Sequence, residues 1–263
     1  MARRILGVLL AALALWGCPD KNKPTRETNT LRIHMEAEPA HLVSMLQPDA
    51  WAHRITSHNL FESLVQLHPR SYEVQGELAS TWKVSDDKLT YTFYLRDGVR
   101  WHDGKPFTGA DVTFTLDRLL DPAVRAASAR ASLQPFIDSY RLVEDNVLEI
   151  TCKRPSRWFL VSIADLAILP RHVMRKGDLN KHPALRRPVG TGPYRFAGWK
   201  SGRSITLERF PGYWGEKPRI RRLVYRIVRD AGVALKLPRR RELDFVPRGG
   251  AARWRRQGLQ DTL

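Results

Sequence analysis

Cysteine is scarce in this chain of 263 residues, which contains only Cys18 and Cys152. Two cysteines can form at most one disulfide, which is too few for a fold held together by disulfides, so that class of protein is excluded. Low-complexity tracts are also lacking, because the 17 Gly and 17 Pro are dispersed through a chain that is 43% hydrophobic. This composition is typical of a globular protein and excludes collagen-like and fully disordered proteins.

Long hydrophobic runs are missing as well, apart from one at the start of the chain. Residues 5–16 are apolar or small, follow Arg3 and Arg4, and precede Gly17 and Cys18. This run is too short for a membrane-spanning helix, which needs about 20 residues. A positive start, a short apolar run and a small residue are typical of a secretory signal, so we predict a signal peptide over 1–18 and exclude a polytopic membrane protein.

The end of this signal, LWGC at 15–18, resembles the lipobox of bacterial lipoproteins. The resemblance implies that Cys18 is acylated and becomes the mature N-terminus. A free cysteine behind an ordinary signal and a cysteine buried in a helix are the alternatives. Residues 19–30 are charged, contain two prolines and lack hydrophobic periodicity, which predicts a flexible tether between the lipid and a folded body.

Acidic residues are outnumbered, and the net charge is +17. The excess lies mostly in residues 186–263, where 20 Lys and Arg face 6 Asp and Glu. The arginines occur in scattered runs without a zinc-ligand pattern or an aromatic RNA-binding motif, so nucleic acid is not an expected partner. A solvated basic surface explains them most simply. A surface that binds anionic polymers or lipids is the alternative.

Catalytic motifs are absent from the sequence: there is no G-x-S-x-G, H-E-x-x-H, C-x-x-C or Walker loop. The G-T-G at 190–192 lacks the third glycine of a dinucleotide loop and reads as a tight turn. Five histidines crowd the early chain without a repeated ligand spacing. These are His34, His41, His53, His58 and His68. We therefore predict no enzyme activity, no cofactor and no metal site.

The hydropathy pattern mixes two periodicities. Period-two alternation predicts two hairpins and four further strands, namely 82–84 with 89–95, 140–143 with 147–152, and 31–35, 204–210, 223–228 and 243–246. Helical spacing predicts helices over 55–67, 108–120, 158–169 and 230–237. Thr108 and Asp111 are spaced as a capping box at the start of the second helix. The mixture indicates an α/β fold with a mixed sheet.

Two long stretches resemble a known family. The first, at 78–112, contains LRDGVRWHDGKPFT over 95–108, and the second, at 189–218, contains VGTGPY over 189–194 and GYWG over 212–215. Together they resemble the peptide-binding class of extracellular solute-binding proteins. Members of this class serve ATP-binding-cassette (ABC) importers for oligopeptides, dipeptides and nickel.

The resemblance implies a periplasmic-binding-protein-like clamshell whose two lobes close over a ligand. Because it spans about 31–247, we expect these residues to form the first, mixed-sheet lobe. Residues 248–263 would form a basic truncated tail, and the second lobe would be absent from this chain.

The implied function is capture of peptides or similar small solutes in the periplasm or cell envelope, and their delivery to the permease subunits of an ABC importer. The protein would be held at a membrane by the lipid on Cys18. A non-functional truncated fragment of such a receptor is the alternative. The resemblance places first-lobe ligand contacts at Glu38, Pro39, Ala40 and His41 and around residues 126–136, while the identity of the ligand stays open.

Overall fold

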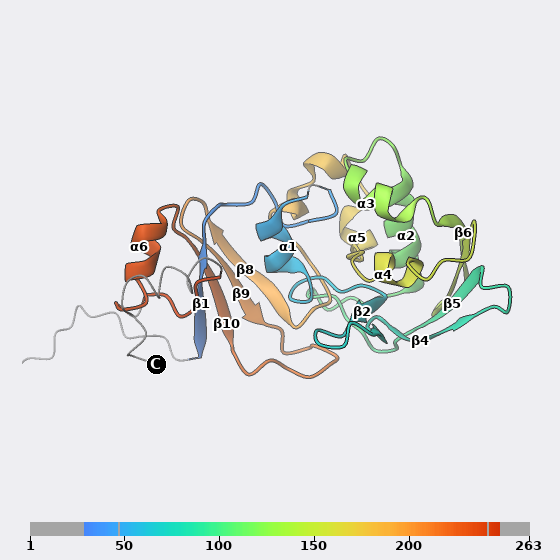
Figure 1. Cartoon of the computed structure of the whole chain (residues 1–263), viewed down its shortest axis with the longest axis horizontal. Helices are drawn as coiled ribbons and strands as arrows, with labels where there is room; N and C mark the ends of the chain where they lie inside the picture. Colours follow the sequence, from blue (N-terminus) through green and yellow to red (C-terminus); the bar gives the residue numbers. More distant parts are fainter. Residues whose placement is uncertain (1–28, 47, 241, 248–263) are drawn as a thin grey trace, which may run out of the picture.

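The structure of the protein is a computed structural model that describes residues 29–46, 48–240 and 242–247 (Figure 1). The predicted signal peptide, the acylated Cys18, nearly all of the predicted tether and the predicted tail at 248–263 lie outside the described residues. Within the described residues, no helix has the length and apolar character needed to cross a membrane.

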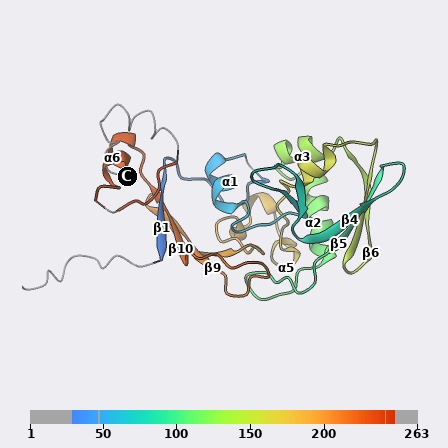
Figure 2. The same cartoon turned by 60° about the horizontal axis from the view of Figure 1, so that its bottom comes forward.

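One part of the molecule is built on a four-stranded mixed sheet. Its strands, in order, are β1 (Thr30–Met35), β10 (Arg222–Ile227), β9 (Ser204–Arg209) and β8 (Tyr194–Lys200). β1 runs parallel to β10, and the other neighbours are antiparallel. Segments from opposite ends of the described chain therefore meet in one sheet. Helix α6 (Ala231–Lys236) follows β10 and lies at the far end of the molecule (Figures 1 and 2).

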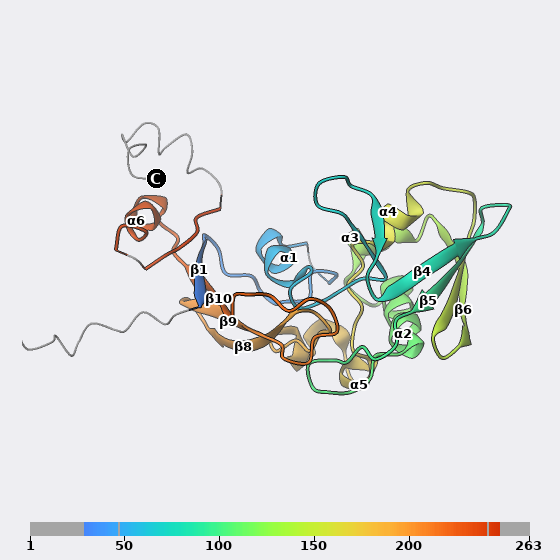
Figure 3. The ribbon, with the colours of Figure 1, turned by 90° about the horizontal axis from the view of Figure 1, so that it is seen from below.

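The other part is built on a four-stranded antiparallel sheet. Its strands, in order, are β4 (Ala79–Val84), β5 (Thr90–Leu95), β7 (Val147–Cys152) and β6 (Ile137–Glu144). Along β5, the alternate residues Tyr91, Phe93 and Leu95 are buried, as the pleat of a half-buried strand requires. Helix α2 (Gly109–Leu120) packs against β6, and α3 (Ala127–Leu133) lies beside α2 (Figure 3).

Short elements connect the two sheets. They are α1 (Ala50–Thr56), the hairpin of β2 (Val65–Leu67) and β3 (Val74–Gly76), α4 (Phe159–Ile163), α5 (Arg171–Met174), and the 3-10 turns η1 (Leu179–Lys181) and η2 (Pro183–Leu185). Helix α1 lies between the sheets in two views (Figures 1 and 3). One continuous cluster of buried side chains runs from Leu207 in the mixed sheet to Phe93 in the antiparallel sheet, so the two parts share a core.

The predicted α/β fold with a mixed sheet is confirmed, and so are both hairpins. Helix α2 has Thr108 as its N-cap, and the Asp111 carboxylate accepts a hydrogen bond from the Thr108 amide at 3.0 Å, as expected of a capping box. The strand predicted at 243–246 is reduced to a bridge between Phe245 and Ile33.

Two of the predicted helices are wrong. The helix predicted over 55–67 is almost entirely absent, because α1 ends at Thr56, His58 adopts a φ of 56° and the chain then turns into β2. The helix predicted over 158–169 is limited to α4. Beyond it, the backbone amide of Ile168 donates to the carbonyl of Glu62 at 3.0 Å rather than to its own turn. In both stretches adjacent apolar residues are buried, Leu60 with Phe61 and Ile168 with Leu169, so their spacing does not report a single helical face.

Candidate functional site

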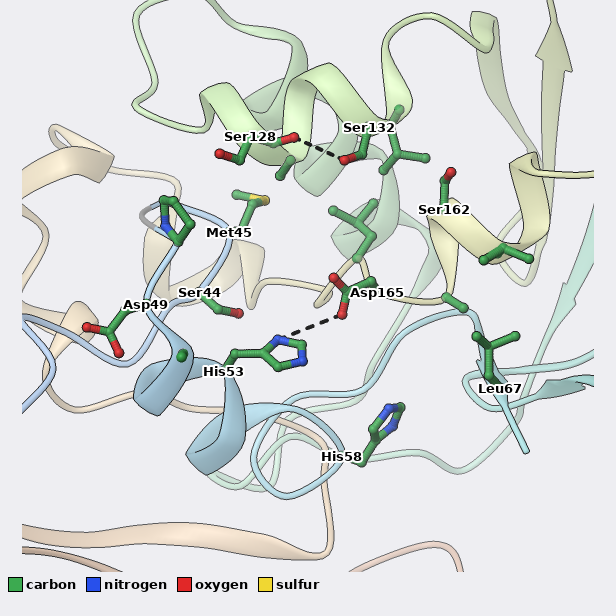
Figure 4. A pocket seen from close by; sticks show the side chains of 17 residues that line it. Ser44, Met45, Asp49, His53, His58, Leu67, Ser128, Ser132, Ser162 and Asp165 are labelled. Atoms are coloured by element: carbon green, nitrogen blue, oxygen red, sulfur yellow. Dashed lines mark hydrogen bonds and ion pairs between the residues drawn. The ribbon is translucent and has the colours of Figure 1, made fainter. Parts of the chain in front are cut away.

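A cavity of about 770 Å³ lies between α1, α3 and the chain that follows α4 (Figure 4). This volume falls in the range of small-molecule sites, about 300–1,000 Å³. Apolar side chains on its wall include Met45, Leu133 and Leu166, and four serines supply hydroxyls. The serines are Ser44, Ser128, Ser132 and Ser162.

Two short helices position the polar groups of the wall. Asp49 is the N-cap of α1, and its carboxylate accepts hydrogen bonds from the amides of Trp51 at 2.8 Å and Ala52 at 2.7 Å. This cap fixes the start of α1, which brings His53 to the cavity one turn later. On α3, Ser128 and Ser132 are four residues apart and therefore share the face that lines the cavity.

His53 and Asp165 face each other across the middle of the cavity (Figure 4). The distance from His53 Nδ1 to Asp165 Oδ1 is 3.8 Å, and the Asp165 side chain is 72% exposed. His58 also lines the wall and lies 2.9 Å from the buried carboxylate of Glu77. The hydrogen bond to Glu77 raises the pKa of His58 and outweighs the burial that opposes its charge.

The predicted ligand residues Glu38, Pro39, Ala40 and His41 form the loop after β1 and are not part of the cavity wall. Pro39 is buried and Ala40 is exposed. The ring of His41 accepts a hydrogen bond from the amide of Val43 at 3.3 Å, and burial lowers its pKa. The role of this loop in ligand binding stays a prediction.

Glu38 is the most constrained member of the loop. Its carboxylate accepts hydrogen bonds from Trp199 Nε1 at 2.6 Å, Ser201 Oγ at 2.9 Å and the Gly202 amide at 2.9 Å. Burial raises the pKa of Glu38, but these hydrogen bonds and the charge of Arg186 outweigh burial and hold the pKa below its usual value. Glu38 therefore ties the loop to the β8–β9 turn.

The predicted stretch 126–136 does reach the cavity. Ser128, Ala129, Ser132 and Leu133 of α3 belong to its wall. Nothing in the sequence marks His53 and Asp165 as a pair of site residues. They lie more than a hundred residues apart on unrelated elements, so no local motif could signal that they meet.

A second polar cluster lies where the β9–β10 loop contacts the rest of the protein. Glu62 is 2% exposed and accepts hydrogen bonds from Tyr213 Oη at 2.8 Å and Trp214 Nε1 at 3.0 Å. Burial, together with the charge of Glu77, raises the pKa of Glu62 to about 7 despite these two donors. The cluster anchors the loop and holds a carboxyl group that titrates near neutral pH.

Comparison with known proteins gives consistent matches. The family model described as "Bacterial extracellular solute-binding proteins, family 5 Middle" matches residues 73–263. The dipeptide-binding protein of Escherichia coli strain K12 is 31% identical over 242 residues, which cover 84% of this chain and 45% of that protein. Heme-binding protein A of Haemophilus influenzae is 29% identical over 256 residues, which cover 86% of this chain and 47% of that protein.

The fold matches in the same way. The oligopeptide-binding protein AppA from Bacillus subtilis, solved in complex with a nonapeptide, superposes with a TM-score of 0.79 at 26% identity. The match covers 88% of this chain and 46% of that one. This chain therefore spans about half the length of the relatives it matches, as expected for one lobe of the clamshell.

Proposed function

Because the chain belongs to family 5 of the bacterial extracellular solute-binding proteins, we propose that it captures a peptide or a similar small solute and delivers it to an ABC importer. The observation that carries the proposal is the cavity of about 770 Å³ between α1, α3 and the chain after α4. The proposal is for binding without chemistry, in keeping with the family's description as solute-binding proteins.

The wall suits a peptide because it combines two kinds of surface. Serine hydroxyls both donate and accept hydrogen bonds, so Ser44, Ser128 and Ser162 can pair with the amides and carbonyls of a peptide backbone. Met45 and Leu133 offer apolar surface to its side chains, and methionine adapts to differently shaped partners. A wall of this kind favours a class of short peptides over one defined molecule.

Titration calorimetry with peptides of two to five residues tests the proposal, and we expect saturable binding that tolerates salt. Ala129→Trp places an indole inside the cavity and should weaken binding strongly, whereas Ala127→Trp, at an exposed position of the same helix, should not. Equal affinities for the two variants would place the ligand elsewhere. Binding that falls steeply with salt would favour the basic surface of residues 186–263 as a binder of anionic polymers instead.

We also propose that the protein works in the cell envelope, held to a membrane by a lipid on Cys18. The support is the sequence: an Arg-led apolar run that ends in LWGC, followed by a charged tether over 19–30. Each buried CH₂ of an acyl chain contributes about 0.8 kcal/mol, so two or more chains hold a protein stably at a bilayer.

Fractionation of expressing bacteria grown with labelled palmitate tests this anchor. Cys18→Ala should remove the label and shift the protein from the membrane to the soluble fraction. Cys152→Ala is the matched control, since Cys152 is buried in the antiparallel sheet and should leave the label unchanged. A labelled, membrane-bound Cys18→Ala variant would contradict acylation at this site.

A further inference from the structure

We infer that the cavity selects solutes that carry a positive charge and that Asp165 is the residue that pairs with this charge. The inference rests on the proposed function, because it concerns the same cavity. It starts from the charges on the wall: two carboxylates, Asp49 and Asp165, and two imidazoles, with no Lys or Arg among the described residues that line it. The net charge of the whole chain, +17, has the opposite sign.

The two carboxylates are not equally available to a ligand. Asp49 uses Oδ1 to accept two backbone hydrogen bonds at the start of α1. The Asp165 carboxylate accepts no hydrogen bond from the described residues, and its side chain is 72% exposed toward the cavity and solvent. Its neighbour His53 lies at 3.8 Å, which is longer than a hydrogen bond. Asp165 therefore keeps its acceptor sites for a ligand.

The imidazoles do not reverse the sign of the cavity. Asp49 and Asp165 on the wall and Glu77 beside His58 supply three carboxylates, one more than the two imidazoles, so negative charge prevails even when both rings carry a proton. When His58 is protonated, its charge is balanced by Glu77, whose side chain is 4% exposed and lies 2.9 Å away. The remaining charge on the wall is negative, so a cationic ligand is attracted and an anionic ligand is repelled.

The surroundings of Asp165 favour a cation on an apolar stem. Ser162 lies three residues before Asp165 and adds a hydroxyl oxygen, while Val161 and Leu166 add aliphatic surface. An ammonium or guanidinium group can donate charge-assisted hydrogen bonds to the carboxylate while its methylene groups pack on this surface. The inferred ligand class is therefore a peptide or small solute with an amine or guanidine group.

Four peptide probes test the inference on the full chain by titration calorimetry at pH 7.5 and moderate salt. They are Ala-Lys-Ala, Ala-Gln-Ala, N-acetyl-Ala-Gln-Ala and Ala-Glu-Ala, which cover net charges from positive to negative at similar size. We expect the affinity of Ala-Lys-Ala to exceed that of Ala-Glu-Ala by about 10- to 100-fold, the range for hydrogen bonds to charged groups. Asp165→Asn should remove most of this preference, and Asp165→Lys should reverse it.

Asp138→Asn is the control, because it makes the same change of charge at an exposed position on β6, outside the cavity wall. It should keep the preference of the wild type. Equal binding of all four probes, or an unchanged preference in Asp165→Asn, would overturn the inference and leave the proposed function standing. If none of the probes, no other short peptide and no small basic solute binds, the proposed function fails and the inference fails with it.

Discussion

The imidazole of His102 is hydrogen-bonded to the backbone at Gly190, and this contact brings together the two family-like stretches of the sequence. The amide of Gly190 donates to Nδ1 at 3.0 Å, and the other ring nitrogen, Nε2, lies 3.0 Å from the carbonyl oxygen of Gly192. Since Nδ1 accepts, the proton must be on Nε2, where it is donated to Gly192. The contact therefore requires a neutral ring, and burial lowers the pKa of His102 to about 4.

Because the folded protein keeps this ring neutral, the contribution of His102 to stability decreases in mild acid. The unfolded chain takes up a proton at this position below about pH 6.5, whereas the folded protein does so only near pH 4. The free energy of unfolding should therefore fall by roughly 3 kcal/mol through this group as the pH drops from 6.5 to 4. His102→Gln keeps a donor and an acceptor but does not titrate. The free energy of unfolding of this variant, measured with urea across this pH range, should therefore lack the pH dependence that comes from His102. The wild type measured in parallel is the reference, and an identical slope in His102→Gln would contradict this account.

For Glu62 we expect the opposite dependence of the free energy of unfolding on pH. Its pKa is about 7 in the folded protein, above the ordinary value of 4.5, so stability from this group is present below pH 4.5 and is lost as the pH rises through 7. The expected loss is roughly 3 kcal/mol. Glu62→Gln should flatten this part of the pH profile of the free energy of unfolding. Glu216→Gln, at an exposed position of the same β9–β10 loop, should leave the profile unchanged.

The two groups can be tested against each other. Between pH 4.5 and 6.5 their contributions have opposite signs, so they nearly cancel in the wild type. Glu62→Gln alone should then make the protein lose stability on acidification, and His102→Gln alone should make it gain stability. The double variant should return to the wild-type slope. Single variants with the wild-type slope would show that neither group titrates as described.

Close packing around Gly190, which contacts His102, leaves no room for a side chain at this position. A Cβ at this position would lie 1.7 Å from the carbonyl oxygen of Leu60, a backbone atom that cannot move aside cheaply. We expect Gly190→Ala to lower the free energy of unfolding by about 3 kcal/mol or more. Gly198→Ala is the matched control, because a Cβ there meets no atom within 4 Å. Similar unfolding midpoints for the two variants would contradict the close packing at Gly190.

Features that depend on neighbouring residues were predictable from the sequence, whereas features that depend on distant contacts were not. The hairpin with Tyr91 and Phe93 was predictable because one face of the strand is buried and period two records that face. The stretches 55–67 and 158–169 were mispredicted because adjacent apolar residues are buried there, so burial does not follow one helical face. The structural role of His102 was not predictable, because its partner Gly190 lies far along the chain.

In the candidate site, too, the residues brought together by distant packing were not predictable from the sequence. The stretch 126–136 was connected with the ligand only through the family resemblance, and α3 within it lines the cavity. The pairing of His53 with Asp165 depends on the packing of α1 against the chain after α4, which no local pattern encodes. Asp165 also follows α4 within a stretch that is predicted to be one helix, so its exposure to the cavity does not follow from the local pattern.

We expect the Glu38 carboxylate to stabilise the β8–β9 turn. The amide of Gly202 donates to Glu38 Oε2 at 2.9 Å, and Trp199 and Ser201 donate to Oε1. Glu38→Ala leaves these donors without their acceptor, so we expect a loss of about 1–3 kcal/mol in the free energy of unfolding. Amide hydrogen exchange at Gly202 should become faster, because the turn opens more often. Glu36→Ala, at an exposed position on the same loop, should leave exchange at Gly202 unchanged. If both variants exchange at the wild-type rate, Glu38 does not hold the turn, and the ligand contact implied by the family resemblance becomes the better account of this carboxylate.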